Sequence, residues 1–139
     1  MSNLIVNIKK NEGYISTVYK DSLGIDTIGY GFAIKDLNLE EDICDIILER
    51  KINKLRAEVK KRFKWYDNMP VIIREVVMEM CYQMGVTGFS KFKKTIGFFE
   101  AKDFKGASVE MLDSKWAVQT PGRAKQLSEK VRKVGEATR

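Results

Sequence analysis

The sequence has no histidine and only two cysteines, Cys44 and Cys81. Without histidine and without a CxxC pair, the usual zinc sites and the serine–histidine and cysteine–histidine nucleophiles are excluded. Acid–base chemistry therefore falls to carboxylates, lysine, tyrosine or cysteine, and we expect no metal or cofactor. The two cysteines are predicted to be reduced thiols in or near the core.

Long apolar runs are also absent. No segment approaches the roughly 20 apolar residues that a membrane-spanning helix needs, so we expect no stable membrane association. The first residues lack the basic, apolar and small-residue regions of a secretory signal, which predicts synthesis in a cytoplasm. Repeats, low-complexity tracts and Pro/Ser-rich linkers are missing, so the 139 residues are predicted to form one domain.

The charge is more informative about surfaces than about partners. The chain has 25 Lys and Arg against 19 Asp and Glu, a net charge of +6. A basic surface suits nucleic acid, anionic lipid or the phosphate- and carboxylate-rich bacterial wall. Because the basic residues are spread along the chain, most are expected to be solvated, and we expect no nucleic-acid partner.

The pattern near the N-terminus predicts a helix over 3–11 that stops at Gly13. Strand-like segments follow at 17–19 and 25–28. Between them, residues 21–24 have Asp first and Gly fourth, as a type I turn prefers. The sequence therefore predicts a small β-hairpin after the first helix.

Helical patterns dominate the rest of the chain. Asn38 and Glu41 form a capping-box signature for a long helix. An apolar helix with little polar face begins at Pro70 and ends at Gly85 and Gly88; it is predicted to be buried. Shorter helices are expected near 93–99 and 104–112, and Thr120–Pro121 predicts the start of a helix to about Val134.

The predicted fold class is therefore α+β, mostly α, with two lobes. Its parts are a small β-containing lobe over 14–38, a connecting helix over 39–61, and a helical lobe over 62–139 that also takes the helix 3–11.

Two charges stand at unfavourable helix ends. Glu12 lies at the C-terminal end of its predicted helix, and Arg123 lies in the first turn of the last one. The helix macrodipole disfavours each by about 0.3–1 kcal/mol. Direct pairing of the two would explain both placements; the alternative is that both are exposed and only weakly penalised.

Three separated segments carry a resemblance to a known family. Glu12-Gly13, Asp21 and the run Thr27-Ile28-Gly29-Tyr30-Gly31 resemble the active-site segment of the T-even phage lysozymes, glycoside hydrolase family 24. The segments 83–88 and 116–124 resemble that family's QMGxTG and WxxQTPxRA motifs, with the same spacing between them. The resemblance covers essentially the whole chain, and is thin between residues 33 and 70.

The resemblance implies a two-lobed lysozyme fold whose cleft takes a peptidoglycan strand. The implied reaction is inverting hydrolysis of the β-1,4 bond between N-acetylmuramic acid and N-acetylglucosamine, without a cofactor. Glu12 would be the general acid and Asp21 the second carboxylate, while Thr27 would help to hold the attacking water. Arg123 would pair with the acid, and Gly29 and Gly31 would let the backbone approach the sugar. The implied substrate contacts are Gly31, Ala33, Tyr82, Gln83 and Thr95.

The chain departs from the family at three points. Phe32 stands where the family has a histidine, Ala33 replaces a larger apolar residue, and the chain is shorter between Gly31 and the long helix. We therefore expect a trimmed small lobe. Two alternatives remain open: a catalytically silent glycan-binding or structural module on the same fold, and a lytic transglycosylase, which needs only the acid.

In its biological role, the resemblance implies a monomeric endolysin. Such a protein would wait in the host cytoplasm until a holin permeabilises the membrane, and would then act on the periplasmic wall.

Overall fold

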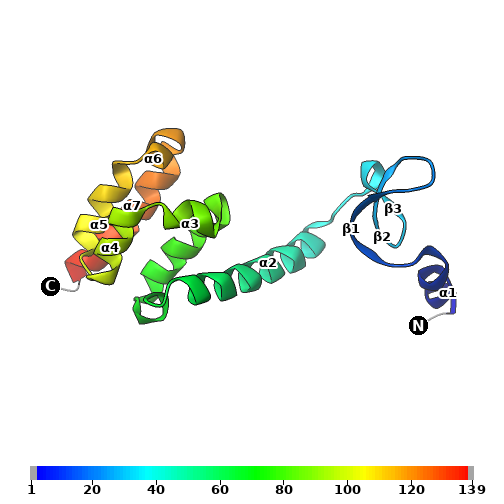
Figure 1. The fold of residues 1–139 in the computed structure, drawn as a ribbon, viewed down its shortest axis with the longest axis horizontal. Helices are drawn as coiled ribbons and strands as arrows, with labels where there is room; N and C mark the ends of the chain where they lie inside the picture. Colours follow the sequence, from blue (N-terminus) through cyan, green and yellow to red (C-terminus); the bar gives the residue numbers. More distant parts are fainter. Residues whose placement is uncertain (1–2, 138–139) are drawn as a thin grey trace. The chain divides into compact units, whose positions relative to one another are not determined.

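The computed structural model describes residues 3–137, which form seven α-helices and one three-stranded sheet (Figure 1). This confirms the predicted α+β, mostly helical fold class. The chain divides after Asp45 into an N-terminal unit and a helical unit, and each is described by itself. None of the helices in residues 3–137 is long and apolar enough to cross a membrane.

The N-terminal unit contains the first helix and the sheet. Its elements are α1 (Asn3–Glu12), β1 (Ile15–Lys20), β2 (Asp26–Gly29), β3 (Phe32–Ala33) and a 3-10 turn, η1 (Ile34–Asp36). The strands are antiparallel in the order β1-β2-β3. The predicted hairpin is confirmed; the third strand was not predicted, because two residues are too short to show a period.

The end of α1 follows from one glycine. Gly13 has a φ of +71°, and its N–H donates to the Lys9 carbonyl at 2.9 Å. A left-handed residue after the last turn is a common helix stop that favours glycine. The predicted stop is confirmed, and it leaves Glu12 as the last residue of the helix.

The strand register places two residues of interest side by side. Thr27 pairs with Tyr19 on β1 and with Ala33 on β3. Directly opposite residues in a sheet project their side chains to the same face. Thr27 and Ala33 therefore share one face of the small sheet.

The long helix α2 spans Glu41–Arg62 without interruption, as predicted for the connecting helix. The predicted N-cap was wrong. The first carbonyl to accept a helical hydrogen bond is that of Glu40, which accepts from the N–H groups of Ile43 and Cys44, each at 3.1 Å. Starting there places Glu41 and Asp42 in the first turn, where the macrodipole favours negative charge.

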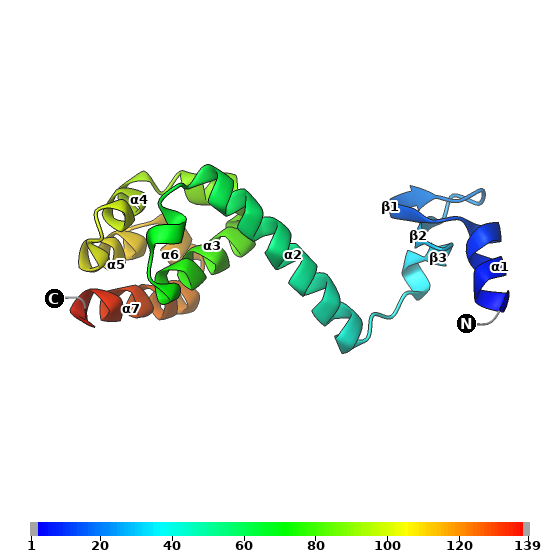
Figure 2. The ribbon, with the colours of Figure 1, turned by 90° about the horizontal axis from the view of Figure 1, so that it is seen from below.

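In the helical unit, most of the helices after α2 pack against α7. These elements are η2 (Tyr66–Asn68), α3 (Val71–Ser90), α4 (Lys93–Glu100), α5 (Phe104–Leu112), α6 (Lys115–Gln119) and α7 (Pro121–Ala137). Helices α3, α5 and α6 contact α7, and α4 contacts α5 (Figures 1 and 2). The fully buried side chains of this core come from several helices and include Val59, Ile73, Met80, Phe89, Phe99, Met111, Leu127 and Val131.

One side of the apolar helix α3 is buried, as predicted for the helix, whereas Val71, Ile72 and Tyr82 are exposed. Its interruption falls at Gly85, which has a φ of +80° and is not helical, so the residues after it form a second short helical segment. Cys81 lies in this helix, and burial raises the pKa of its thiol to about 12. The prediction for Cys44 was wrong: this thiol is exposed, because its part of α2 buries no residue before Val59.

Candidate active site

The three predicted catalytic residues all lie in the N-terminal unit. Glu12 ends α1, Asp21 directly follows β1, and Thr27 lies inside β2. The three residues thus belong to consecutive elements of this unit and are at most 15 positions apart in the sequence.

Asp21 is fixed by its own turn. One carboxylate oxygen, Oδ1, accepts the backbone N–H groups of Leu23 at 2.8 Å and Ile25 at 2.9 Å. The Asp21 backbone closes the turn, donating to the Ile25 carbonyl at 3.0 Å and accepting from the Gly24 N–H at 2.9 Å. The predicted turn is confirmed. Because both side-chain bonds use Oδ1, the second oxygen keeps its lone pairs for another donor.

Thr27 is also held by the backbone of Ile25, which donates to the Asp21 carboxylate. It is 3 % exposed, and its hydroxyl donates to the Ile25 carbonyl at 2.8 Å. With its proton committed, the oxygen has lone pairs that can only accept. Asp21 and Thr27 are thus both tied to the backbone of Ile25, a link that no side-chain pattern could reveal.

Glu12 lies against the glycine-rich turn between β2 and β3. A Cβ on Gly31 would stand 2.5 Å from Glu12 Oε2, and Gly31 has a φ of +74°. A Cβ on Gly29 would stand 2.8 Å from the ring of Phe32. The sequence assigned both glycines to backbone approach by sugar; within the unit, the groups that approach them are Glu12 and Phe32.

An aromatic cluster that the sequence did not predict lies beside the acid. Tyr30 has its ring 5.6 Å from that of Tyr14 and 6.3 Å from that of Phe32. The ammonium group of Lys9 lies 5.4 Å from the centre of the Tyr30 ring. The available signal was that Tyr30 lies within the motif 27–31 and that Phe32 directly follows it. Phe32, in place of the family's histidine, packs on Gly29 instead of offering a charge.

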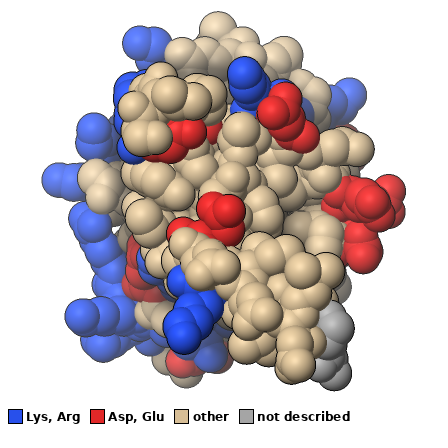
Figure 3. All heavy atoms as spheres, turned by 90° about the vertical axis from the view of Figure 1, so that its right-hand side faces the viewer, with Lys and Arg blue, Asp and Glu red and all other residues tan. Residues whose placement is uncertain are grey.

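Figure 3 shows one face of the protein, on which acidic residues form separate groups and most of the visible basic residues lie along the left edge of the picture. Near the site, Lys20 pairs with Asp26 at 2.7 Å across the hairpin. Both side chains are more than half exposed, so this pair contributes little stability.

Arg123 lies in the first turn of α7, in the helical unit. Its guanidinium lies 3.6 Å from Glu79 on α3, and Glu79 is also 4.0 Å from Lys130. This acid compensates part of the unfavourable placement of Arg123. Sequence analysis missed Glu79, although it is one of only three charged residues in α3 and was therefore a usable signal. Arg123 and Tyr82 line the same cavity of about 570 Å³.

The remaining predicted substrate contacts also lie in the helical unit. Tyr82 is 50 % exposed and is not part of the helical core. The Gln83 amide oxygen accepts from the indole N–H of Trp116 at 2.9 Å, which joins the two motifs of the helical unit. Thr95 is buried in the first turn of α4 and lines a second cavity with Trp116.

A mostly helical chain whose small sheet has Thr27 in a strand, Asp21 in its hairpin turn and Glu12 at the end of the preceding helix fits the lysozyme-type glycoside hydrolases. A family model described as phage lysozyme matches residues 9–133. The chain belongs to this family.

Two curated relatives, both from Dictyostelium discoideum, carry names of the same kind. "Probable T4-type lysozyme 2" is 28% identical over 159 aligned positions, covering 91% of this chain and 92% of the relative. "Probable T4-type lysozyme 1" is 27% identical over 150 positions, covering 86% and 88%. Because this chain has 139 residues, both alignments contain gaps in it.

Proposed function

We propose that this lysozyme is a muramidase that hydrolyses the β-1,4 bond between N-acetylmuramic acid and N-acetylglucosamine by inversion. Glu12 is the general acid that protonates the leaving oxygen. Asp21 and Thr27 hold the water that attacks the opposite face of the sugar. Inverting hydrolases keep their carboxyl groups roughly 6.5–9.5 Å apart to leave room for that water.

The shared anchoring of Asp21 and Thr27 on Ile25 is the observation that carries this proposal. A water placed between them donates one hydrogen to the free oxygen of Asp21 and the other to the Thr27 hydroxyl, which accepts because its own proton is used. Its lone pair is then left for the anomeric carbon. Two acceptors and no competing donor suit a general base and its helper.

We further propose that Arg123 pairs with Glu12 in the working enzyme, and that α1 packs with the helical lobe. Two observations support this: α1 buries none of its residues, and Arg123 is partly exposed at the wall of a cavity with apolar sides. The test is a double-mutant cycle on the free energy of unfolding with Glu12→Gln and Arg123→Gln. Additive effects would reject the pairing.

The substrate contacts proposed for Gly31, Ala33, Tyr82, Gln83 and Thr95 complete the glycan-binding surface. Of these, Ala33 lies opposite Thr27 on the sheet, which supports its place beside the reacting sugar.

The direct test is turbidity loss of outer-membrane-permeabilised Gram-negative cells, with mass analysis of the products. Wild type should clear the suspension and release muropeptides with a reducing N-acetylmuramic acid end. Glu12→Gln should fold and be inactive. Release of anhydro-muropeptides would instead identify a lytic transglycosylase, and binding without cleavage would identify a glycan-binding module.

We propose host-cell lysis as the biological role, which the phage lysozyme family match supports. The protein would then be monomeric and would depend on a holin to reach the wall. Expression in a bacterium should leave cells intact until the inner membrane is permeabilised, and lysis without permeabilisation would contradict this role.

A further inference from the structure

The last turn of α1 places a lysine beside the proposed acid. Lys9 and Glu12 are three positions apart, and side chains at this spacing are neighbours on the surface of a helix. Lys10 lies in the same turn, but residues two positions apart do not face each other. An ion pair between Lys9 and Glu12 would hold the ammonium group against the carboxylate.

The ammonium group of Lys9 instead lies on an aromatic ring. It is 5.4 Å from the centre of the Tyr30 ring, within the roughly 6 Å over which a ring face attracts a cation. Within residues 3–137, Lys9 forms no ion pair. An exposed cation–π contact is at least as strong as an exposed i,i+3 ion pair, and lysine before glutamate is the less favourable order for that pair. The contact with Tyr30 is therefore the favoured one.

Tyr30 is held in place by two other rings. Its ring centre lies 5.6 Å from that of Tyr14 and 6.3 Å from that of Phe32, which it meets nearly edge-on at 81°. The next residue in the chain is Gly31, against which the Glu12 carboxyl group lies. One short turn therefore contacts the acid at one residue and the neighbouring cation at the residue before it.

The position of this cation matters for the chemistry of the acid. A general acid must carry a proton at the working pH, and a cation beside a carboxyl group lowers its pKa because it favours the ionised form. The charged and titratable neighbours of Glu12 are Lys9 in its own helix, Tyr14 and Tyr30 next to the turn, and Arg123, its proposed partner from the helical unit. Lys9 would be a second cation on the same carboxyl group.

We propose, on the basis of the general-acid function of Glu12 proposed above, that Tyr30 is a positioning residue. Its ring holds the Lys9 ammonium group away from Glu12, so that the acid keeps its proton to a higher pH. The ring face is the part that matters, so phenylalanine at this position should serve equally well. An aliphatic side chain should release the ammonium group, which then pairs with Glu12 across the i,i+3 spacing.

The test is an NMR titration of the Glu12 side-chain carboxyl carbon in the full chain, beside the pH dependence of wall clearing. Tyr30→Leu should lower the Glu12 pKa by about 0.7 of a pH unit, the effect of a unit charge about 4 Å away in water. Since the protonated acid is the active form, clearing should start to fall at a correspondingly lower pH. Tyr30→Phe should keep the wild-type pKa, and Lys9→Met/Tyr30→Leu should restore it.

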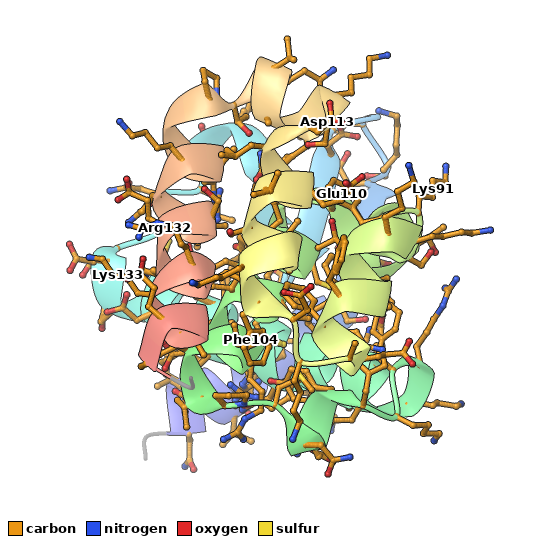
Figure 4. All side chains as sticks on the ribbon, turned by 90° about the vertical axis from the view of Figure 1, so that its left-hand side faces the viewer. Lys91, Phe104, Glu110, Asp113, Arg132 and Lys133 are labelled. Atoms are coloured by element: carbon orange, nitrogen blue, oxygen red, sulfur yellow. The ribbon has the colours of Figure 1, made fainter. Side chains whose placement is uncertain are left out.

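Two further lysines provide matched controls in the Tyr30→Leu background. Lys10→Met removes a lysine from the same helical turn that does not face Glu12. Lys133→Met removes one from α7 in the helical unit, where Figure 4 labels it. Neither change should restore the Glu12 pKa. Restoration by either one would mean that net charge, and not the position of Lys9, sets the pKa, and would overturn the proposal.

An unchanged Glu12 pKa in folded Tyr30→Leu also overturns the proposal. If that variant does not fold, Lys9→Met alone decides. It should leave the Glu12 pKa close to that of wild type, whereas a rise of about 0.7 of a pH unit would mean that the ammonium group already acts on the acid.

The titration needs no activity, so it separates this proposal from the muramidase proposal. A chain that shows the expected pKa pattern without clearing walls refutes the muramidase function and leaves the role of Tyr30 on Lys9 standing. A chain that clears walls with the same Glu12 pKa in wild type and Tyr30→Leu refutes the role of Tyr30 alone.

Discussion

Gly31→Ala probes the contact on which the position of the acid depends. The new Cβ would stand 2.5 Å from Glu12 Oε2 and 3.2 Å from its Cδ, at a residue with a φ of +74°. The left-handed backbone costs an L-residue about 1–2 kcal/mol. Because real Cβ atoms do not come this close to another atom, the Glu12 carboxyl must also move.

The expected result has two parts. The backbone strain should lower the melting temperature by a few degrees, since about 1 kcal/mol shifts a domain of this size by roughly 2–8 °C. The displacement of the acid should lower kcat by about 10²-fold, the scale expected when a catalytic group moves by about 1 Å. Thermal unfolding and initial clearing rates on permeabilised cells measure the two parts separately.

Gly85→Ala is the matched control. Gly85 has a φ of +80°, and a Cβ there would meet no atom within 4 Å. It should therefore suffer the same strain without displacing any side chain, and keep most of its activity. If the two variants lose stability and activity to the same extent, the contact between Gly31 and Glu12 does not position the acid.

Further predictions concern the water-holding hydroxyl, the link between α3 and α6, and the thiols. Thr27→Val should lower kcat by about 10²-fold or more while Thr27→Ser retains most activity, in clearing assays; a fully active valine variant would reject the role of the hydroxyl. Gln83→Ala leaves the Trp116 indole N–H without its acceptor and should cost about 1–3 kcal/mol in urea unfolding, and an unchanged midpoint would contradict this. At neutral pH a thiol reagent should label only the exposed Cys44, with Cys81 reacting after denaturation. Because burial raises the pKa of Cys81 from 9.0 to about 12, its contribution to stability is full below pH 9 and is lost as the pH rises toward 12; wild type and Cys81→Ala should therefore differ in the slope of stability against pH in that range.

Local patterns predicted most of the secondary structure. The stop at Gly13, the turn over 21–24 and the helix start at Pro121 depend on bonds between near neighbours, and all three formed as expected. The N-cap predicted at Asn38 was wrong, because the first carbonyl to accept a helical bond is that of Glu40, two residues later.

In the candidate site too, local bonds could be predicted from the sequence and long-range contacts could not. The sequence by itself nominated Glu12, Asp21 and Thr27 as candidate catalytic residues. It also determined the turn that fixes the Asp21 carboxylate, because an Asp at the first position of a turn bonds to the backbone of that turn. Only the tertiary structure decided that Glu12 lies against Gly31, that Gln83 holds Trp116, and that Arg123 meets Glu79. These contacts join residues between 19 and 44 positions apart. Their formation depends on how whole elements pack, which no short stretch of sequence encodes.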